Sequence, residues 1–139
     1  MPSHTLTFKL VTPVKTVLEE EVEQVTLDTE EGEITVLPYH SPIVSIVRPG
    51  ELVIKQNGAS RGLSIAGGIV EMFGNTLLVL ADTAEHANEI ELERAEKKAT
   101  ELAQELSSQE HMDITTYNTL QRQLEKEQAR VHVAKKWRK

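Results

Sequence analysis

Glycine and proline are confined to the first part of this chain. All seven glycines and all five prolines lie at or before Gly74, so residues 75–139 contain neither. These two residues punctuate turns, and they are the least favourable residues inside a helix. The first part of the chain is rich in turn-forming and β-branched residues, whereas the last third consists mainly of Glu, Ala, Leu, Gln, Lys and Arg. The sequence therefore predicts two structural units, a β unit followed by a helical unit.

The composition limits the class of protein. A chain of 139 residues is long enough for one ordinary domain with a modest appendage. It contains no cysteine, which excludes disulfides, thiolate metal sites and a cysteine nucleophile. No apolar run approaches the roughly 20 residues that span a bilayer, and residues 1–7 lack the basic and apolar regions of a signal peptide. We therefore expect a protein made and kept in a cytosol-like compartment.

The net charge of −7 is distributed unevenly along the chain. Acidic side chains outnumber basic ones in residues 1–110, whereas residues 111–139 carry seven basic side chains against three acidic ones. One interpretation of this basic end is a solvated, solubilising helix. The other is a surface that binds an acidic partner. Nucleic acid is not expected as a partner, because it would repel a molecule that is acidic as a whole.

Short strands separated by turn signals are predicted up to residue 87. Leu6, Phe8 and Leu10 alternate with polar residues, which is the period-2 pattern of a half-buried strand. Asn57-Gly58 has the composition of a type I′ hairpin turn. We interpret Gly67-Gly68 as a bulge or a close backbone contact inside a strand. With Pro49-Gly50 taken as a break, the pattern predicts about ten strands, which is typical of a β-sandwich or flattened barrel.

Residues 88–139 predict an antiparallel hairpin of two helices. Asn88 followed by Glu91 fits a capping box at the start of the first helix, and Asp113 is the expected N-cap of the second. The pattern breaks over residues 107–112. An apolar stripe marks the first helix, at Leu92, Ala95, Ala99, Leu102 and Leu106. Because alanine buries little area, we expect a weak seam between the hairpin and the β unit. Such a seam suits a hairpin that docks and undocks, and a merely marginal hairpin is the alternative.

The residues that could carry catalysis or bind a metal are not arranged for it. The five histidines have no metal-ligand spacing, and His40 is interpreted as a packing or surface residue of a turn. Gly62, Gly67 and Gly68 lack the Lys and Ser or Thr that complete a P-loop. No nucleophile, base and orienting residue can be assembled. We therefore expect no catalytic residues, no metal site and no enzymatic activity of the chain's own.

Several segments resemble a known family. They occur in the same order as in the ε subunit of F-type ATP synthases of bacteria and plastids, and the similarity extends into Ile90–Ala95. The resemblance implies an N-terminal β-sandwich, a C-terminal helical hairpin and the role of a non-catalytic central-stalk subunit. The matching segments are Leu10-Val11-Thr12-Pro13, Glu31-Gly32-Glu33-Ile34, Leu37-Pro38-Tyr39-His40-Ser41-Pro42, Pro49-Gly50, Ile65 to Glu71 and Leu78 to Glu85.

The resemblance also implies partners and a location. In that family the sandwich, here residues 1–87, binds the foot of the γ shaft and the polar loops of the membrane c-ring, and it couples rotation of the ring to the shaft. By this resemblance Glu33, Tyr39 and His40 would face the c-ring. The protein would lie at the cytoplasmic face of the bacterial cell membrane and would meet the membrane only through the c-ring. The stromal face of the plastid thylakoid is the alternative location.

The hairpin of that family inhibits ATP hydrolysis, which implies a role for a basic stripe in residues 88–139. Arg122, Lys126 and Arg130 recur every four residues, so they lie on one face of the second helix. By resemblance, this stripe would meet acidic residues of a catalytic β subunit in the α/β head when the hairpin extends along γ. The other interpretation is a free-standing adaptor that presents a mobile hairpin to some other acidic protein.

Some members of the family bind ATP at the first helix. Their motif reads here as Ile90-Glu91-Leu92-Glu93-Arg94-Ala95. In place of the motif's Asp stands Glu91, and in place of a basic residue of the nucleotide binders stands Glu101, an acid that would repel phosphate. A plain capped helix start and an ATP-sensing module are the two interpretations of this segment. The plain helix start, with no cofactor, is the favoured interpretation. In the alternative, ATP is a regulatory ligand with a candidate site at Glu85, Ile90, Glu91, Arg94, Arg122 and Arg130.

Overall fold

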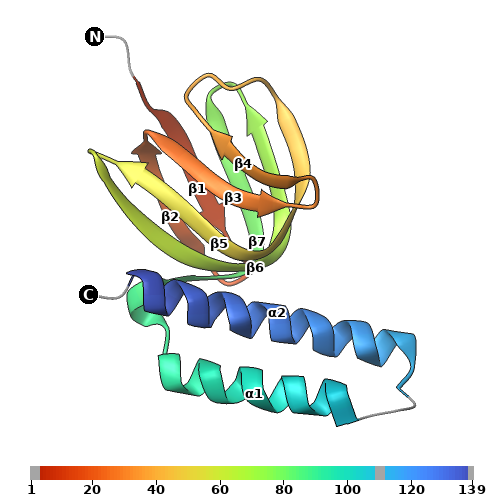
Figure 1. The fold of residues 1–139 in the computed structure, drawn as a ribbon. Helices are drawn as coiled ribbons and strands as arrows, with labels where there is room; N and C mark the ends of the chain where they lie inside the picture. Colours follow the sequence, from red (N-terminus) through yellow and green to blue (C-terminus); the bar gives the residue numbers. More distant parts are fainter. Residues whose placement is uncertain (1–3, 109–111, 138–139) are drawn as a thin grey trace.

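The computed structural model describes residues 4–108 and 112–137. Part of the predicted break in the helical pattern, residues 109–111, lies outside the described residues. Within the described residues, seven strands precede a 3-10 turn and two helices (Figure 1). The elements are β1 (Leu6–Val11), β2 (Thr16–Val22), β3 (Gln24–Thr29), β4 (Gly32–Val36), β5 (Ile43–Gln56), β6 (Ala59–Phe73), β7 (Thr76–His86), η1 (Ala87–Glu89), α1 (Leu92–Ser108) and α2 (Ile114–Trp137).

The strands form one sheet that folds over on itself into a sandwich (Figure 1). Their order is β2-β1-β7-β6-β5-β3-β4, with β1 parallel to β7. The predicted alternation in β1 is confirmed, because Leu6, Phe8 and Leu10 are fully buried. Together with inward-facing residues of the other strands, such as Leu27 and Leu52, they form one hydrophobic cluster. The buried members of that cluster lie between residues 6 and 81, so the core of the sandwich is built without the helices.

The number of strands is seven, not about ten, because two predicted breaks are bends inside long strands. β5 continues through Pro49, which lacks a backbone N–H, at a point where the pairing of β3 with β5 shifts register. β6 continues through Gly67 and Gly68, whose φ angles are +67° and +140°. A Cβ atom on Gly68 would overlap the Leu80 carbonyl oxygen of β7. The predicted close backbone contact is therefore confirmed, and the strands bend there from one layer of the sandwich to the other.

The two helices form the predicted hairpin, but its seam differs from the prediction. α2 lies between the sandwich and α1, and it contacts β5 and β6 (Figure 1). The expectation that the Ala-rich stripe of α1 would form the seam with the sandwich was wrong. Ala95 packs in a second hydrophobic cluster with Val133 and Ala134 of α2. The physical reason is that charged side chains of α2 form ion pairs with side chains of the sandwich. The apolar stripe of α1 packs against apolar residues of α2 instead.

The starts of the two helices test the predicted caps. The backbone N–H of Thr116 donates to Asp113 Oδ1 at 2.7 Å, which confirms Asp113 as an N-cap. Hydrogen bonds from the backbone N–H and from the side chain of Thr116 lower the pKa of Asp113. The predicted box at Asn88 and Glu91 was wrong, because residues 87–89 form a separate 3-10 turn. α1 begins at Leu92 instead, and the Glu91 carbonyl accepts its first hydrogen bond, from the N–H of Ala95.

Candidate interaction surfaces and ligand site

Tyr39 and His40 lie in the turn between β4 and β5, at the end of the sandwich away from the helices (Figure 1). Tyr39 has a left-handed backbone, with φ of 64°, and its N–H donates to the side chain of Asn75 at 2.7 Å. This bond ties the turn to the β6–β7 hairpin. The His40 N–H donates to the Leu37 carbonyl, and its Nδ1 lies 2.7 Å from the Ser41 carbonyl oxygen. The turn is therefore held in one conformation with its side chains at the surface.

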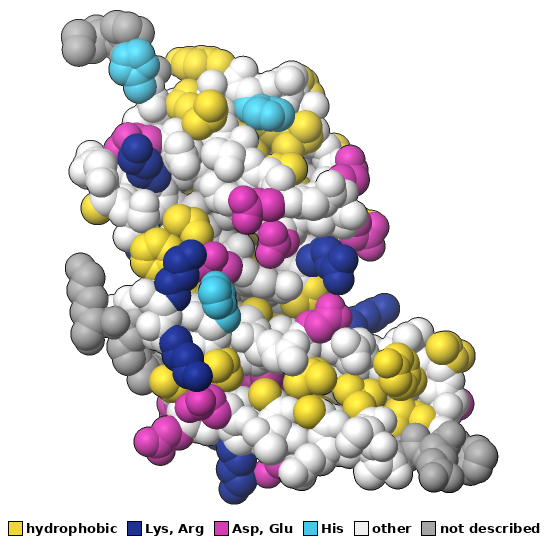
Figure 2. Space-filling view, viewed as in Figure 1, with side chains coloured by type: hydrophobic (Ala, Val, Ile, Leu, Met, Phe, Trp, Pro, Cys, Tyr) yellow, Lys and Arg dark blue, Asp and Glu magenta, His cyan; other side chains and the backbone are white. Residues whose placement is uncertain are grey.

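This end of the sandwich exposes large apolar side chains. Leu37, Tyr39 and Phe73 are 51%, 68% and 68% exposed. Figure 2 shows hydrophobic side chains gathered over this end of the molecule. We call these three residues the end patch. Contiguous exposed apolar groups on a small protein mark a surface that contacts another molecule.

Glu33 is exposed but lies apart from the end patch. It follows the β3–β4 turn and pairs across the sheet with Asp28. Glu33 and Val36 are three positions apart, which corresponds to roughly 10 Å along the strand, and Leu37 follows Val36. The structure therefore brings Tyr39 and His40 into one turn, and it places Glu33 at the other end of β4.

A second apolar surface crosses the outer face of the sheet, and the sequence analysis missed it. Ile46, Ile69 and Leu80 are cross-strand neighbours on β5, β6 and β7, and each is about half exposed. With Val11 and Pro13 they line a hollow of about 620 Å³. We call Ile46, Ile69 and Leu80 the sheet-face row. The signal was available in the sequence, because these outward positions carry Ile and Leu where a solvated face would carry polar residues.

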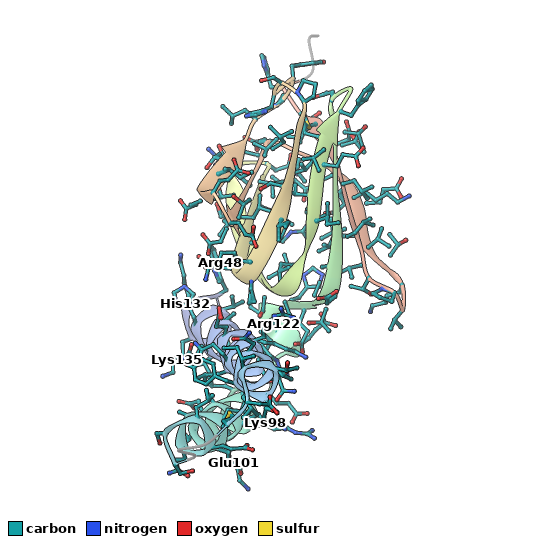
Figure 3. The ribbon with its side chains drawn as sticks, turned by 90° about the vertical axis from the view of Figure 1, so that its right-hand side faces the viewer. Arg48, Lys98, Glu101, Arg122, His132 and Lys135 are labelled. Atoms are coloured by element: carbon teal, nitrogen blue, oxygen red, sulfur yellow. The ribbon has the colours of Figure 1, made fainter. Side chains whose placement is uncertain are left out.

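The candidate ATP residues are only partly brought together. Glu85, Glu91, Arg94 and Arg130 line one hollow of about 350 Å³, beside Lys98 and two further carboxylates, Glu89 and Glu127. Lys98 is a base that sequence reasoning missed, and Figure 3 shows it on α1 with Glu101. Ile90 is fully buried in the second hydrophobic cluster. Arg122 lies in a different hollow, two helical turns away along α2.

Arg130 is already neutralised in this arrangement. Its Nε lies 2.8 Å from Glu85 Oε1, and its Nη1 donates to Glu127 Oε1 at 2.7 Å. Burial by itself would lower the pKa of Arg130, but hydrogen bonds and charge from Glu127 and Glu85 outweigh it and raise the pKa. Four carboxylates face three cations in this hollow, so it presents no excess of positive charge to a triphosphate.

The basic stripe of Arg122, Lys126 and Arg130 faces the sandwich rather than solvent alone. Arg122 and Lys126 line a hollow of about 810 Å³ between α2 and the bend of the sheet, together with Arg48. Figure 3 shows Arg48 at the edge of the sandwich and Arg122 on α2 beneath it. Arg48 itself lies 3.6 Å from Glu125 of α2. With the hairpin docked, Arg130 is paired with Glu85 and Glu127, whereas Arg122 and Lys126 line the hollow between α2 and the sheet.

The described part of the chain contains no candidate metal site and no candidate membrane-spanning helix. Across residues 4–108 and 112–137, no group of three or more His, Asp or Glu side chains is placed to hold a metal ion. In the same residues, neither helix is both long enough and apolar enough to cross a membrane. The features that do stand out are two apolar surfaces and a docked, charged hairpin. Together they define a protein that acts through contact with other proteins.

Comparison with known proteins agrees with this class and identifies the family. Residues 5–87 match the family model described as the β-sandwich domain of the ATP synthase delta/epsilon chain. The chain is 37% identical over 131 residues to the ATP synthase epsilon chain of Geotalea uraniireducens, which covers 94% of each protein. The chain belongs to the ATP synthase delta/epsilon chain family.

A second relative and two solved structures extend the comparison. The ATP synthase epsilon chain of Herpetosiphon aurantiacus is 43% identical over 89 residues, which cover 64% of this chain and 65% of that protein. A chain of the Euglena gracilis mitochondrial ATP synthase has a TM-score of 0.79 at 23% identity, covering 91% of this chain and 79% of that one. A chain of the Tetrahymena thermophila enzyme has a TM-score of 0.68 at 16% identity, covering 92% and 95%. These two show that the fold is shared.

Proposed function

We propose that this chain is a non-catalytic central-stalk subunit of an F-type ATP synthase, which couples c-ring rotation to the γ shaft. The observation that carries the proposal is a rigid sandwich with two separate apolar surfaces, the end patch and the sheet-face row. A coupling subunit needs two contacts, one for each part that it joins. The family membership supplies the identity of those parts.

We assign the end patch, with Tyr39 and His40, to the c-ring and the sheet-face row to γ. The end patch combines aromatic and apolar groups with hydrogen-bonding groups, as contact with polar loops requires. The sheet-face row spans three neighbouring strands and borders a hollow of about 620 Å³. Such a surface can accept an extended or helical partner along its length. Through the c-ring the subunit would lie at the cytoplasmic face of the membrane without entering it.

Co-purification with γ tests the assignment of the sheet-face row. Ile69→Asp places a charge in the centre of the row, so we expect γ binding to fall at least tenfold while the sandwich still folds. Ala59→Asp is the matched control, because Ala59 is exposed at the start of β6, beside the β5–β6 turn and outside the row. Equal retention of γ by the parent chain and the Ile69→Asp variant would contradict the assignment.

We propose further that the hairpin inhibits ATP hydrolysis when it leaves the sandwich. The support is that Arg130 of the basic stripe is paired in the docked state with Glu85 of the sandwich and Glu127 of α2, while Arg122 and Lys126 line the hollow beside the sheet. The docked molecule would then be the non-inhibiting form. A hydrolysis assay on a complex of α, β and γ, with and without the chain, tests this. Replacement of Arg122, Lys126 and Arg130 by Gln should relieve inhibition, and inhibition unchanged by the triple replacement would refute the electrostatic account.

We propose that the cluster around Arg130 serves docking rather than ATP binding. Its support is the balance of four carboxylates against three cations around the hollow. Isothermal titration of the full chain with ATP should therefore give no heat of binding at micromolar concentrations. Saturable heat that disappears in Arg94→Gln would show instead that ATP displaces the internal ion pairs.

A further inference from the structure

The last turn of α2 carries the one tryptophan of the chain, and its indole lies on the sandwich. Trp137 packs against Gly62 of β6 so closely that a Cβ atom on Gly62 would overlap the indole ring. The Trp137 Nε1–H donates to Glu51 Oε2 of β5 at 2.6 Å. Gly62 pairs with Val53, two residues from Glu51 on the same face of β5. Two neighbouring strands therefore contact the Trp137 side chain, β6 through the backbone of Gly62 and β5 through the carboxylate of Glu51.

Glu51 gathers further partners from the same end of α2. Lys136 Nζ lies 3.2 Å from both carboxylate oxygens of Glu51, and His132 Nε2 lies 3.7 Å from Oε1. Lys136 also lies 5.2 Å from the centroid of the Trp137 ring, which keeps the two neighbours in one arrangement. The Glu51 side chain is only 18% exposed. Burial alone would raise its pKa, but the hydrogen bonds from Trp137 and Lys136 and the charges of Lys136 and His132 hold the pKa below its ordinary value.

Apart from the Arg130–Glu85 pair, whose atoms lie 2.8 Å and 3.2 Å apart, the rest of the seam between α2 and the sandwich holds less firmly. The buried apolar residues Val133 and Ala134 belong to the cluster with η1 and α1, not to the core of the sandwich. The Arg48–Glu125 pair is long, at 3.6 Å, and more than half of the Arg48 side chain is exposed, so it contributes little. Arg130 keeps Glu127 of its own helix as a partner even when α2 leaves Glu85.

The side chains of Lys136 and Trp137, at the end of α2, have no alternative partner within the described part of the hairpin when α2 leaves the sandwich. Among the described residues, Lys136 has no other carboxylate partner than Glu51, and Trp137 has no other hydrogen-bond acceptor. Undocking of α2 therefore breaks a charge-assisted cluster and exposes an indole, and nothing in the hairpin compensates. We infer that Glu51, Gly62 and Trp137 form a latch that sets the balance between the docked and the released hairpin.

The inference deepens the proposed function, yet its test uses the full chain with no other subunit, so failure of the latch and failure of the central-stalk role can be told apart. Trp137 is a built-in reporter, because its emission shifts to longer wavelength and its quenching by acrylamide increases when the indole meets water. Since the chain has no cysteine, spin labels at Ser60→Cys of β6 and Gln128→Cys of α2 give an independent distance between sandwich and hairpin.

Two variants weaken the latch in different ways. Glu51→Gln keeps the size of the side chain and removes its charge, and Gly62→Ala places a methyl group where the Trp137 indole lies. The matched control is Glu96→Gln, which breaks the 3.4 Å ion pair between Lys135 of α2 and Glu96 of α1 without touching the sandwich. We expect Glu51→Gln to raise the ratio of released to docked hairpin about tenfold, the factor that corresponds to one hydrogen bond to a charged group.

In the latch variants the Trp137 emission should shift to the red and the label distance should lengthen, while circular dichroism of the sandwich and helices stays the same. In Glu96→Gln neither reporter should move. Unchanged emission and distance in Glu51→Gln would overturn the inference, and so would an equal change in the Glu96→Gln control. If Gly62→Ala fails to fold, the comparison of Glu51→Gln with Glu96→Gln still decides the matter.

Discussion

Replacement of Arg130 by Gln should destabilise the docked hairpin far more than the same replacement at an exposed arginine. Arg130 is 18% exposed and is paired with Glu127, whose side chain is 9% exposed, and with Glu85, which is 30% exposed. Removing one partner of a buried ion pair costs about 3–5 kcal/mol, because the remaining charge stays buried without compensation. Since Glu85 retains partial access to water, we expect about 2–3 kcal/mol for Arg130→Gln.

Arg94→Gln provides the matched control. Arg94 forms an i,i+3 pair with Glu91, as Arg130 does with Glu127, but the two side chains are 80% and 71% exposed. Exposed pairs of this kind contribute about 0–1 kcal/mol. The double variant Arg130→Gln/Glu127→Gln removes the uncompensated charge, so it should regain most of the stability lost in the single variant.

Urea unfolding followed by the helical signal measures these differences. Midpoints should fall in Arg130→Gln and recover in the double variant, with an unchanged slope, since a changed slope would mean that the unfolded state or the number of states had altered. A loss in Arg130→Gln within about 0.5 kcal/mol of that in Arg94→Gln, which is the range of ordinary surface substitutions, would refute the claim that Arg130 contributes to docking through Glu85, beside the Glu51 cluster.

Three further predictions follow from the fold and the latch. Gly68→Ala should cost roughly 3 kcal/mol or more and lower the melting temperature, because the added Cβ meets the Leu80 carbonyl. Gly58→Ala is the control, and it should cost about 1 kcal/mol because the Cβ position there is open. Equal melting temperatures of the two variants would contradict this prediction. A chain ending at Asn88 should keep a cooperative thermal transition, since the core lies within residues 6–81; a disordered fragment would contradict it. Burial alone would raise the pKa of Glu51, but hydrogen bonds from Trp137 and Lys136, with the charges of Lys136 and His132, lower it. Its contribution to docking should therefore be complete above about pH 4.5 and lost as the pH falls through the lowered value. The Trp137 emission should follow that loss, and an identical acid shift in Glu51→Gln would contradict the assignment to Glu51.

Local patterns were reliable where local physics decides the outcome. The alternation of Leu6, Phe8 and Leu10 predicted an inward face, and these residues are buried. Asn57 and Gly58 both have positive φ, as a type I′ turn requires. Asp113 caps α2 through a bond to Thr116, three residues along the chain. In each case the interacting groups are close in sequence, so their geometry follows from a few backbone angles.

The strand count failed because a bend and a break look alike in sequence. Pro49-Gly50 and Gly67-Gly68 are breakers by composition, but both occur inside continuous strands. Neighbouring strands decide this, since they supply the register shift beside Pro49 and the close carbonyl beside Gly68. Proline and glycine are accepted where a strand bends, whether or not the strand continues beyond the bend. Only the neighbouring strand decides whether backbone pairing resumes after it.

By itself the sequence determined the two-part organisation of the chain, the inward faces of its elements and the family to which it belongs. The tertiary structure alone decided that α2 rather than α1 meets the sandwich, that Arg122 lies apart from Arg130's partners, and that Glu51 receives Trp137. Glu51 and Trp137 are 86 residues apart in the chain, and no periodicity relates them. Ion pairs and steric fits between distant segments depend on how complete elements pack, so they arise only once the sandwich and the hairpin have been brought together.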